Sequence, residues 1–226
     1  ESVQIYTERK DWLNLAKSKD LLGYIYYDWD SSTLRAQQSA SLALEIFDQL
    51  EEVPDKISPL RLQSIIAYKN NDLRKAQKYA TFALELSRKL QTSAEEMASL
   101  YALVAISRAL TLYEEGIAYA PEAIRLAQST GNKRYEGMVL QELSAIYIQT
   151  GKLELAKKYT EQILEIFKTI RDRANFAYAM IQMGDIHKQL NQISQSKSFW
   201  NEAKKIATHL QQDRLLTEIG KRMSEL

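Results

Sequence analysis

The sequence predicts an all-α protein, a solenoid of repeated helices, on three observations. Similar residues recur every forty positions, as in the columns Ile46, Leu86, Leu126, Ile166, Ile206 and Ile66, Ile106, Ile146, Ile186. Small residues recur in the same way at Ala43, Ala83, Ala123 and Ala203, with Ile163 in the fourth place. The chain has only seven Gly and three Pro, and good helix formers fill its periodic stretches. Repeats of fixed length bury their apolar faces against their neighbours, which is the defining property of a solenoid.

Each forty-residue repeat contains two helical patterns, which we name helix A and helix B in chain order. In the first three repeats and the fifth, A helices are expected near 12–29, 56–69, 94–110 and 174–190. The matching B helices are expected near 32–50, 72–90, 114–129 and 194–210. In the fourth repeat the pattern predicts helices at 134–149 and 153–169, joined at Gly151, a residue suited to a left-handed C-cap.

The apolar positions of the fourth repeat predict which side chains are buried. The A helix has Met138, Leu140, Leu143, Ile146 and Tyr147 on one side. The buried set expected for its B helix is Leu155, Ala156, Tyr159, Ile163, Leu164, Ile166 and Phe167.

The expected organisation is a single domain over residues 1–226, with about five repeats and a cap. The repeats span 12–50, 52–90, 94–130, 132–170 and 172–210; residues 1–11 match the end of a preceding helix, and 213–226 form a capping helix. Asn132 and Asp172, between repeats, are expected N-caps. Pro54 and Pro59 predict a helix break in the longest connection.

The third repeat departs from the pattern. Gly116 replaces the alanine found at Ala36, Ala76 and Ala156, and Pro121 lies inside the expected B helix. A proline there removes a backbone hydrogen bond. The departure predicts either a late-starting or bent helix, or a hinge that lets the two halves flex around a ligand.

Charge and composition exclude several classes of function. The net charge is +1, and the cluster Arg74, Lys75, Lys78, Arg88, Lys89 is interpreted as the solvated outer face of one helix, not as a nucleic-acid interface. The absence of cysteine excludes disulfides, thiol catalysis and thiolate metal sites. No apolar run approaches the roughly 18 residues that span a bilayer. We expect a cytoplasmic protein with no membrane span and no direct contact with nucleic acid.

The spacing within the repeats resembles the tetratricopeptide (TPR) family. The fifth repeat offers Met180, Met183, Gly184, His187, Asn191, Ser196 and Ala203 at that family's positions, and the fourth offers Leu140, Leu143, Ser144, Tyr147, Gly151, Ala156 and Ile163. The match covers residues 12–210, although the family's commonest period is about 34 residues. The longer period is similar to the arrays of kinesin light chains, MalT-type bacterial regulators and bacterial peptide-pheromone receptors. The resemblance implies a right-handed superhelical solenoid of antiparallel helix pairs. Its A helices would line a concave groove that takes a peptide or a helix of a partner.

The A-helix positions that face this groove follow from the register. They form the columns Leu21, Arg61, Tyr101, Gln141, Ile181; Ile25, Ile65, Ala105, Ala145, Asp185; and Asp28, Tyr68, Arg108, Ile148, Lys188, flanked by Trp29, Lys69 and Tyr178. We predict a partner-binding groove made by Arg61, Tyr68, Lys69, Tyr101, Arg108, Gln141, Tyr178 and Lys188, since Arg and Tyr are frequent interface hot spots. The family's clamp for a terminal carboxylate is not expected, because its Asn position holds Ile25, Ile65, Ala105 and Ala145.

No constellation of residues predicts catalysis, a metal site or a cofactor. The two histidines, His187 and His209, lie on different helices of the last repeat, and His187 is expected to be a packed structural residue. The glycines form no phosphate-binding loop. Phe199 and Trp200 are expected to fill the core of the last repeat; the alternative is an aromatic pocket.

Three hypotheses about function follow. The leading one is a non-enzymatic scaffold that binds a peptide or helix of a partner protein in the groove. The alternative is a ligand- or peptide-sensing regulatory domain excised from a larger signalling or transcriptional regulator, which a chain that starts at Glu1 also fits. The third is self-association through the exposed solenoid ends, where Trp12, Leu13 and Leu15 are apolar.

Overall fold

The computed structural model describes residues 11–28, 33–50 and 54–225, and within these ranges it has eleven α-helices and no strand. The helices form two compact units, one ending at Thr111 and the other beginning at Leu112, and each is described by itself. Every expected A and B helix is present, with bounds within one residue of those predicted. The all-α, TPR-like architecture of stacked helix pairs is therefore confirmed. The expected helix end at 1–11 and the flanking Trp29 lie outside the described residues, apart from Asp11.

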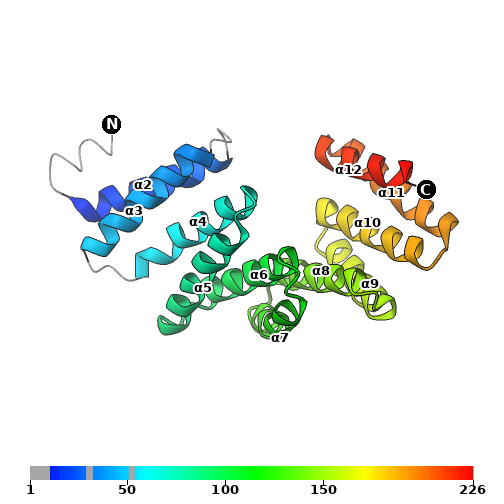
Figure 1. The fold of residues 1–226 in the computed structure, drawn as a ribbon, viewed down its shortest axis with the longest axis horizontal. Coiled ribbons are helices and arrows are strands. Elements are labelled where there is room, and N and C mark those ends of the chain that lie inside the picture. The colour runs from blue at the N-terminus through cyan, green and yellow to red at the C-terminus, as the bar shows by residue number, and fades with distance from the viewer. Residues whose placement is uncertain (1–10, 29–32, 51–53, 226) are drawn as a thin grey trace. The chain divides into compact units, whose positions relative to one another are not determined.

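The N-terminal unit contains two helix pairs and one further A helix. Its elements are α2 (Trp12–Asp28), α3 (Thr33–Gln49), the short 3-10 helix η1 (Pro54–Lys56), α4 (Ile57–Lys69), α5 (Leu73–Lys89) and α6 (Ser93–Ala109). Each helix packs against the next one along the chain, and the A helices α2, α4 and α6 also contact one another in sequence (Figure 1). The predicted helix break is present at Pro54, which begins η1, and α4 begins only at Ile57 and has 13 residues. Pro59 does not break the chain: it lies in the first turn of α4, where its missing N–H has no partner within the helix to lose.

The C-terminal unit continues the same pattern. It contains α7 (Tyr113–Ser129), α8 (Lys133–Gln149), α9 (Leu153–Thr169), α10 (Arg173–Gln189), α11 (Ile193–His209) and α12 (Asp213–Ser224) (Figure 1). The predicted capping helix is α12, which packs against α11. Its buried Leu215 and Ile219 join the core of the last repeat, while its other face is polar and exposed.

The same turn closes the helices at intervals of twenty residues. One residue of each turn has a positive φ, between 53° and 71°, and the backbone groups around it form a Schellman motif. In the first such turn, the N–H of Asp72 donates to the carbonyl of Ala67 (2.8 Å) and the N–H of Asn71 to that of Tyr68 (3.0 Å). The positive-φ residues are Asn71, Gln91, Thr111, Gly131, Gly151, Arg171, Asn191 and Gln211. The predicted left-handed cap at Gly151 is thus confirmed, and it belongs to a series.

The turns between repeats also prepare the next A helix. Asn132 and Asp172 accept hydrogen bonds from the backbone N–H groups of Tyr135 (3.2 Å) and Asn175 (3.1 Å), so the predicted N-caps are confirmed.

Polar side-chain contacts span the same connections. They join the end of a B helix to the start of the next A helix. Arg88 pairs with Glu96 at 3.1 Å, and Gln128 donates to Glu136 at 2.7 Å. Asp48 and Lys56, at the equivalent positions one repeat before Arg88 and Glu96, pair at 2.7 Å. Here the acidic residue comes first and the basic residue second.

The forty-residue columns form the core. Ile66, Ile106, Ile146 and Ile186 are buried on the A helices, and the small-residue column from Ala43 to Ala203 is fully buried on the B helices. These small side chains permit close approach of the helices that face them.

Two expectations about side chains and helix ends were wrong. Leu155 is 42% exposed, because it stands in a column that is otherwise polar: Arg35, Lys75, Glu115 and Gln195. Helix α7 does not start late. It begins at Tyr113, in register with the other B helices, and accommodates Pro121 on its exposed side.

The last repeat replaces a small side chain with a tryptophan. Ala40, Ala80, Ala120 and Thr160 precede Trp200 in its column, and Trp200 is fully buried, which confirms its expected place in the core. Its indole ring occupies the space beside Gly184, where a Cβ atom would overlap the Trp200 ring atoms. In the preceding repeat this contact is a hydrogen bond of 2.7 Å between the hydroxyls of Ser144 and Thr160.

This contact predicts opposite effects for two glycine substitutions. Gly184→Ala is expected to destabilise the protein by about 1–3 kcal/mol, because the added methyl group overpacks against a rigid, buried ring. The matched control is Gly220→Ala in α12, where a Cβ would meet nothing within 4 Å. It is expected to stabilise the protein by up to about 1 kcal/mol through helix propensity. Chemical denaturation of both variants is the measurement, and an unaffected Gly184→Ala variant would contradict the packing described.

Candidate functional site

The A helices of the N-terminal unit form an apolar pocket of about 140 Å³. Ile65 and Tyr68 of α4 lie on one side, and Tyr101 and Ala105 of α6 lie on the other. All four belong to the columns that the sequence placed on the groove face. Tyr68 is 37% exposed and Tyr101 is half-buried, so the two rings border an opening. Ala105 lacks the bulk to fill it. The pocket therefore offers an apolar surface with two phenol groups at its edge.

Three basic residues predicted for the groove belong to the same unit. Lys69 is exposed, and its ammonium group lies 4.9 Å from the centre of the Tyr27 ring, within cation–π distance. Arg108 is half-buried at the last turn of α6. Arg61 faces a separate polar cavity of about 510 Å³ that contains acidic residues of this chain, Asp20 and Asp55 among them.

The Asp20 carboxylate explains why Arg61 is held at this cavity. Burial raises the pKa of Asp20 above its ordinary value, while the nearby charge of Arg61 acts in the opposite direction. Lys17 adds a second cation, 3.4 Å from Asp55. Arg61 thus compensates internal acidic groups, a role that the column alone did not reveal.

Three predicted groove residues belong to the C-terminal unit. The side chain of Gln182 donates to the backbone carbonyl of Gln141 at 2.9 Å, which ties α10 to α8. Tyr178 packs against the core cluster around Trp200, so its ring contributes to the interior as well as to the surface. Lys188 lines a hollow of about 600 Å³ with Asp185 and Ile148, which come from the same column set.

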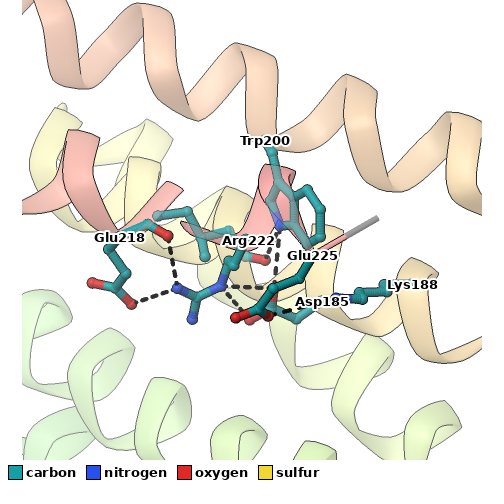
Figure 2. Close-up of polar contacts among 7 residues, drawn as sticks. Asp185, Lys188, Trp200, Glu218, Arg222 and Glu225 are labelled. Carbon is teal, nitrogen blue, oxygen red and sulfur yellow. Dashed lines mark hydrogen bonds and ion pairs between the residues drawn. The ribbon is translucent and has the colours of Figure 1, made fainter. Parts of the chain in front are cut away.

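A polar cluster occupies the inner wall of this hollow (Figure 2). Figure 2 shows the Asp185 carboxylate between the indole of Trp200 and the guanidinium of Arg222. Trp200 Nε1 donates to Asp185 Oδ1 at 3.1 Å, and Arg222 Nε donates to both carboxylate oxygens at 2.9 and 3.0 Å. Arg222 Nη1 also donates to Glu218 at 2.9 Å, and Lys188 lies 3.9 Å from Glu225. The cluster joins α10, α11 and α12.

Sequence reasoning missed this cluster, although two signals for it were present. Asp185 stands in a column otherwise filled by Ile25, Ile65, Ala105 and Ala145, and a carboxylate at such a place needs a partner. Trp200 likewise interrupts a column of small residues. The partner, Arg222, lies on the helix that the sequence predicted only as a cap.

The histidine of α10 has a structural role. His187 is buried, stacks on Phe199 with ring centres 5.2 Å apart, and shares a hydrogen bond through Nδ1 with Gln192, as expected for a packed histidine. In the described ranges no three His, Asp or Glu side chains gather in a way that would hold a metal ion. The helices within those ranges are also too short or too polar to span a bilayer.

The start of α2 shows one difference from the expected apolar end. Trp12 is 44% exposed, but Leu15 is buried against Ala43, Ile46 and Phe47. The surface predicted for self-association therefore lacks Leu15.

Comparisons with known proteins identify the fold. No protein-family model matches the sequence, and no curated protein matches it either. Solved structures do match. BtubC (BKLC) from P. vanneervenii has a TM-score of 0.76 at 17% identity, covering 93% of this chain and 89% of that protein. A putative kinesin light chain from Podospora anserina with TPR-like repeats has a TM-score of 0.71 at 15% identity, covering 88% and 97%.

A third similar structure is the Rap conjugation gene regulator of the plasmid pLS20, in complex with the Phr* peptide. Its TM-score is 0.74 at 13% identity, and the match covers 92% of this chain and 57% of the regulator. Together these matches show that the chain has the fold of long-period, TPR-like helical repeats, as the sequence predicted.

The partly buried Asp185 predicts a pH dependence with a defined sign. Burial raises the pKa of Asp185 above its ordinary value of 3.8, against the opposing effect of Arg222. Between the unfolded and folded pKa values the folded protein holds a proton that the unfolded chain has released. The contribution of Asp185 to stability is therefore expected to fall as pH rises through that window.

The test compares wild type with Asp185→Asn, whose amide oxygen still accepts from Trp200. The free energy of unfolding of wild type, relative to this variant, should be greatest at acidic pH, fall as pH rises above about 3.8, and then become constant. Denaturant titrations between pH 3 and 7 (roughly the range over which a buried carboxyl titrates) measure it. A relative stability that rises with pH would show that pairing with Arg222 outweighs burial.

Proposed function

We propose that this protein is a non-catalytic interaction module that binds a peptide or helix of a partner protein on the A-helix face of its N-terminal unit. The partner places a large apolar or aromatic side chain in the pocket between Tyr68 and Tyr101. The single observation that carries this proposal is the pocket itself, an apolar hollow between α4 and α6.

The size and chemistry of the pocket support this partner. A cavity of about 150 Å³ accepts a benzene ring, so 140 Å³ is suited to one leucine, phenylalanine or similar side chain. Tyrosine combines a large apolar area with a hydroxyl group, and its two torsion angles limit the entropy lost on binding. The hydroxyl group of Tyr68 is suited to a hydrogen bond with the backbone of a bound chain.

The basic residues of the same unit support a partner with carboxylates beside its apolar anchor. Lys69 is exposed and follows Tyr68 directly as the last residue of α4, and Arg108 lies two turns beyond Tyr101 on α6. Charge complementarity of this kind adds specificity and speeds association more than it adds affinity.

The comparisons support the class of function without identifying the partner. The Rap regulator of pLS20 was solved with a peptide, which shows that a fold similar to this one can hold such a ligand. Its 13% identity supports only the fold, so the pocket proposed here depends on the residues of this chain. A location in the cytoplasm and the absence of direct contact with nucleic acid remain predictions.

A sensing domain of a larger regulator is the second candidate. The observation that favours it is the length of the Rap regulator, of which this chain spans 57%. A sensor must pass on the binding event, whereas a scaffold need not. Changed hydrogen-exchange protection of α10–α12 when a peptide occupies the Tyr68–Tyr101 pocket would favour the sensor; protection confined to α4 and α6 would favour the scaffold.

The proposal predicts that Tyr68→Ala and Tyr101→Ala each weaken peptide binding by about 1–3 kcal/mol, or roughly 5- to 150-fold. Peptides selected from a random display library on the wild-type protein provide the ligands. They should share one aromatic or large aliphatic residue, and their affinities are measured by fluorescence anisotropy.

The matched control is Leu155→Ala, which removes an apolar side chain of similar exposure (42%) from a B helix. It should leave the affinity unchanged. Both tyrosine variants should keep the wild-type melting temperature within a few degrees, since their side chains border a cavity. Selected peptides that bind both tyrosine variants as tightly as wild type would refute the proposal.

A further inference from the structure

A second groove lies on the N-terminal unit, between the B helices α3 and α5, and it shares no residue with the Tyr68–Tyr101 pocket. Its volume is about 550 Å³. Leu44 of α3, Leu60 of α4, and Tyr79, Phe82 and Leu86 of α5 form its apolar floor and wall. Such a volume accommodates several side chains of a bound segment.

The apolar surface here departs from the repeat. Phe82 is 45% exposed and Leu42, one repeat earlier in the same column, is 37% exposed. In the later repeats this column holds Glu122, Gln162 and Glu202, which are ordinary surface residues. In this column the apolar side chains are thus confined to α3 and α5, the two helices that border the groove.

The shortened helix α4 accounts for the space between them. The A helices α6, α8 and α10 begin at Ser93, Lys133 and Arg173, and each has 17 residues. By the forty-residue period α4 would begin at position 53, but it begins at Ile57 after the 3-10 turn η1. The first helical turn that fills this position in the other repeats is therefore replaced by η1.

The charges around the groove indicate an acidic occupant. Helix α5 carries five basic residues against the single acidic Glu85. Lys78 and Lys89 line the groove, and the ammonium group of Lys78 lies 5.7 Å from the centre of the Phe82 ring. The other lining carboxylate, Asp48, is already paired with Lys56 at 2.7 Å.

We infer that this groove, formed by α3, α5 and η1, is a docking site for an acidic amphipathic helical segment of a partner protein. The apolar face of the segment covers Phe82 and Leu86, and its carboxylates meet Lys78 and Lys89. These two lysines are eleven residues apart on one helix, about 16 Å at 1.5 Å per residue. A partner helix parallel to α5 offers carboxylates at that distance from positions i and i+11.

The combination of features favours a protein helix over other acidic ligands. A helix laid in a groove buries an apolar stripe and pairs the charges at its edges. A nucleic acid would approach Glu85 and the Asp48–Lys56 pair with phosphates and leave Phe82 without an apolar partner. An anionic membrane would cover Phe82, but unlike a helix it has no row of apolar side chains that enters the groove.

The test uses a defined probe: the acetylated, amidated, fluorescein-labelled peptide EELLEELLEEWLEELL, with a control peptide in which every Glu is Lys. Binding to the full chain is measured by fluorescence anisotropy. The acidic peptide should bind in the micromolar range (about 8 kcal/mol), and the basic peptide should not bind. Phe82→Ala, and separately the double variant Lys78→Glu with Lys89→Glu, should each weaken binding at least tenfold (about 1.4 kcal/mol).

Two control variants separate this site from other surfaces. Gln162→Ala changes the residue of the Phe82 column in a later repeat and should leave the affinity unchanged. Tyr68→Ala changes the apolar pocket and should also have no effect, so the proposed function and this inference can fail independently. Thermal unfolding checks that the variants are folded, which is expected since Phe82, Lys78 and Lys89 are exposed.

Several results would overturn the inference. They are the absence of binding by the acidic peptide, equal binding to wild type and Phe82→Ala, and loss of binding in Tyr68→Ala. Vesicles of phosphatidylserine and phosphatidylcholine serve as a further probe. If they bind wild type but not Phe82→Ala while the peptide does not bind, the basic apolar surface is a membrane contact instead.

Discussion

The structure depends on one local constraint, the three-residue turn that closes helices α4 to α11 at intervals of twenty residues. The turn uses a positive-φ residue and two backbone hydrogen bonds that satisfy carbonyls at the helix end. It sets nearly all described helices to 17 residues, so equivalent side chains return to equivalent places after two helices. Glycine occupies this position only at Gly131 and Gly151 in the described series. At other positions, residues such as Gln91 and Arg171 adopt the left-handed conformation because packing of the flanking helices requires the turn.

Because equivalent residues recur every forty positions, a local change in the repeat can be recognised by comparing one position with its equivalents in the other repeats. Both proposed binding surfaces lie where the repeat changes in this way. Ala105 leaves a hollow that the neighbouring tyrosines border instead of fill. The late start of α4 opens the space beside Phe82. The repeat therefore supplies a stable frame, and local exceptions supply the surfaces on which a partner can bind.

The last repeat shows how an exception is compensated. Trp200 needs the space that Gly184 leaves, and its buried indole N–H needs an acceptor, which Asp185 provides. The Asp185 carboxylate is itself costly to bury, and Arg222 of α12 compensates it. Four residues on three helices thus depend on one another, and they fasten the final helix to the repeat before it. An unpaired member of this set would leave a buried polar group unsatisfied.

The sequence by itself determined the helices, their order and their inward-facing columns. A forty-residue period and a 3.6-residue period together leave only one way to bury Ile66, Ile106, Ile146 and Ile186. Even the groove columns were partly predictable, since Ile65, Tyr68, Tyr101 and Ala105 do meet around one pocket. Only the tertiary structure decided which of these residues have partners within the chain. Arg61 compensates Asp20, and Asp185 binds Arg222 from 37 positions away. Such pairings depend on distances between side chains of different helices, and a periodic pattern specifies the face on which a side chain lies but not what it meets there.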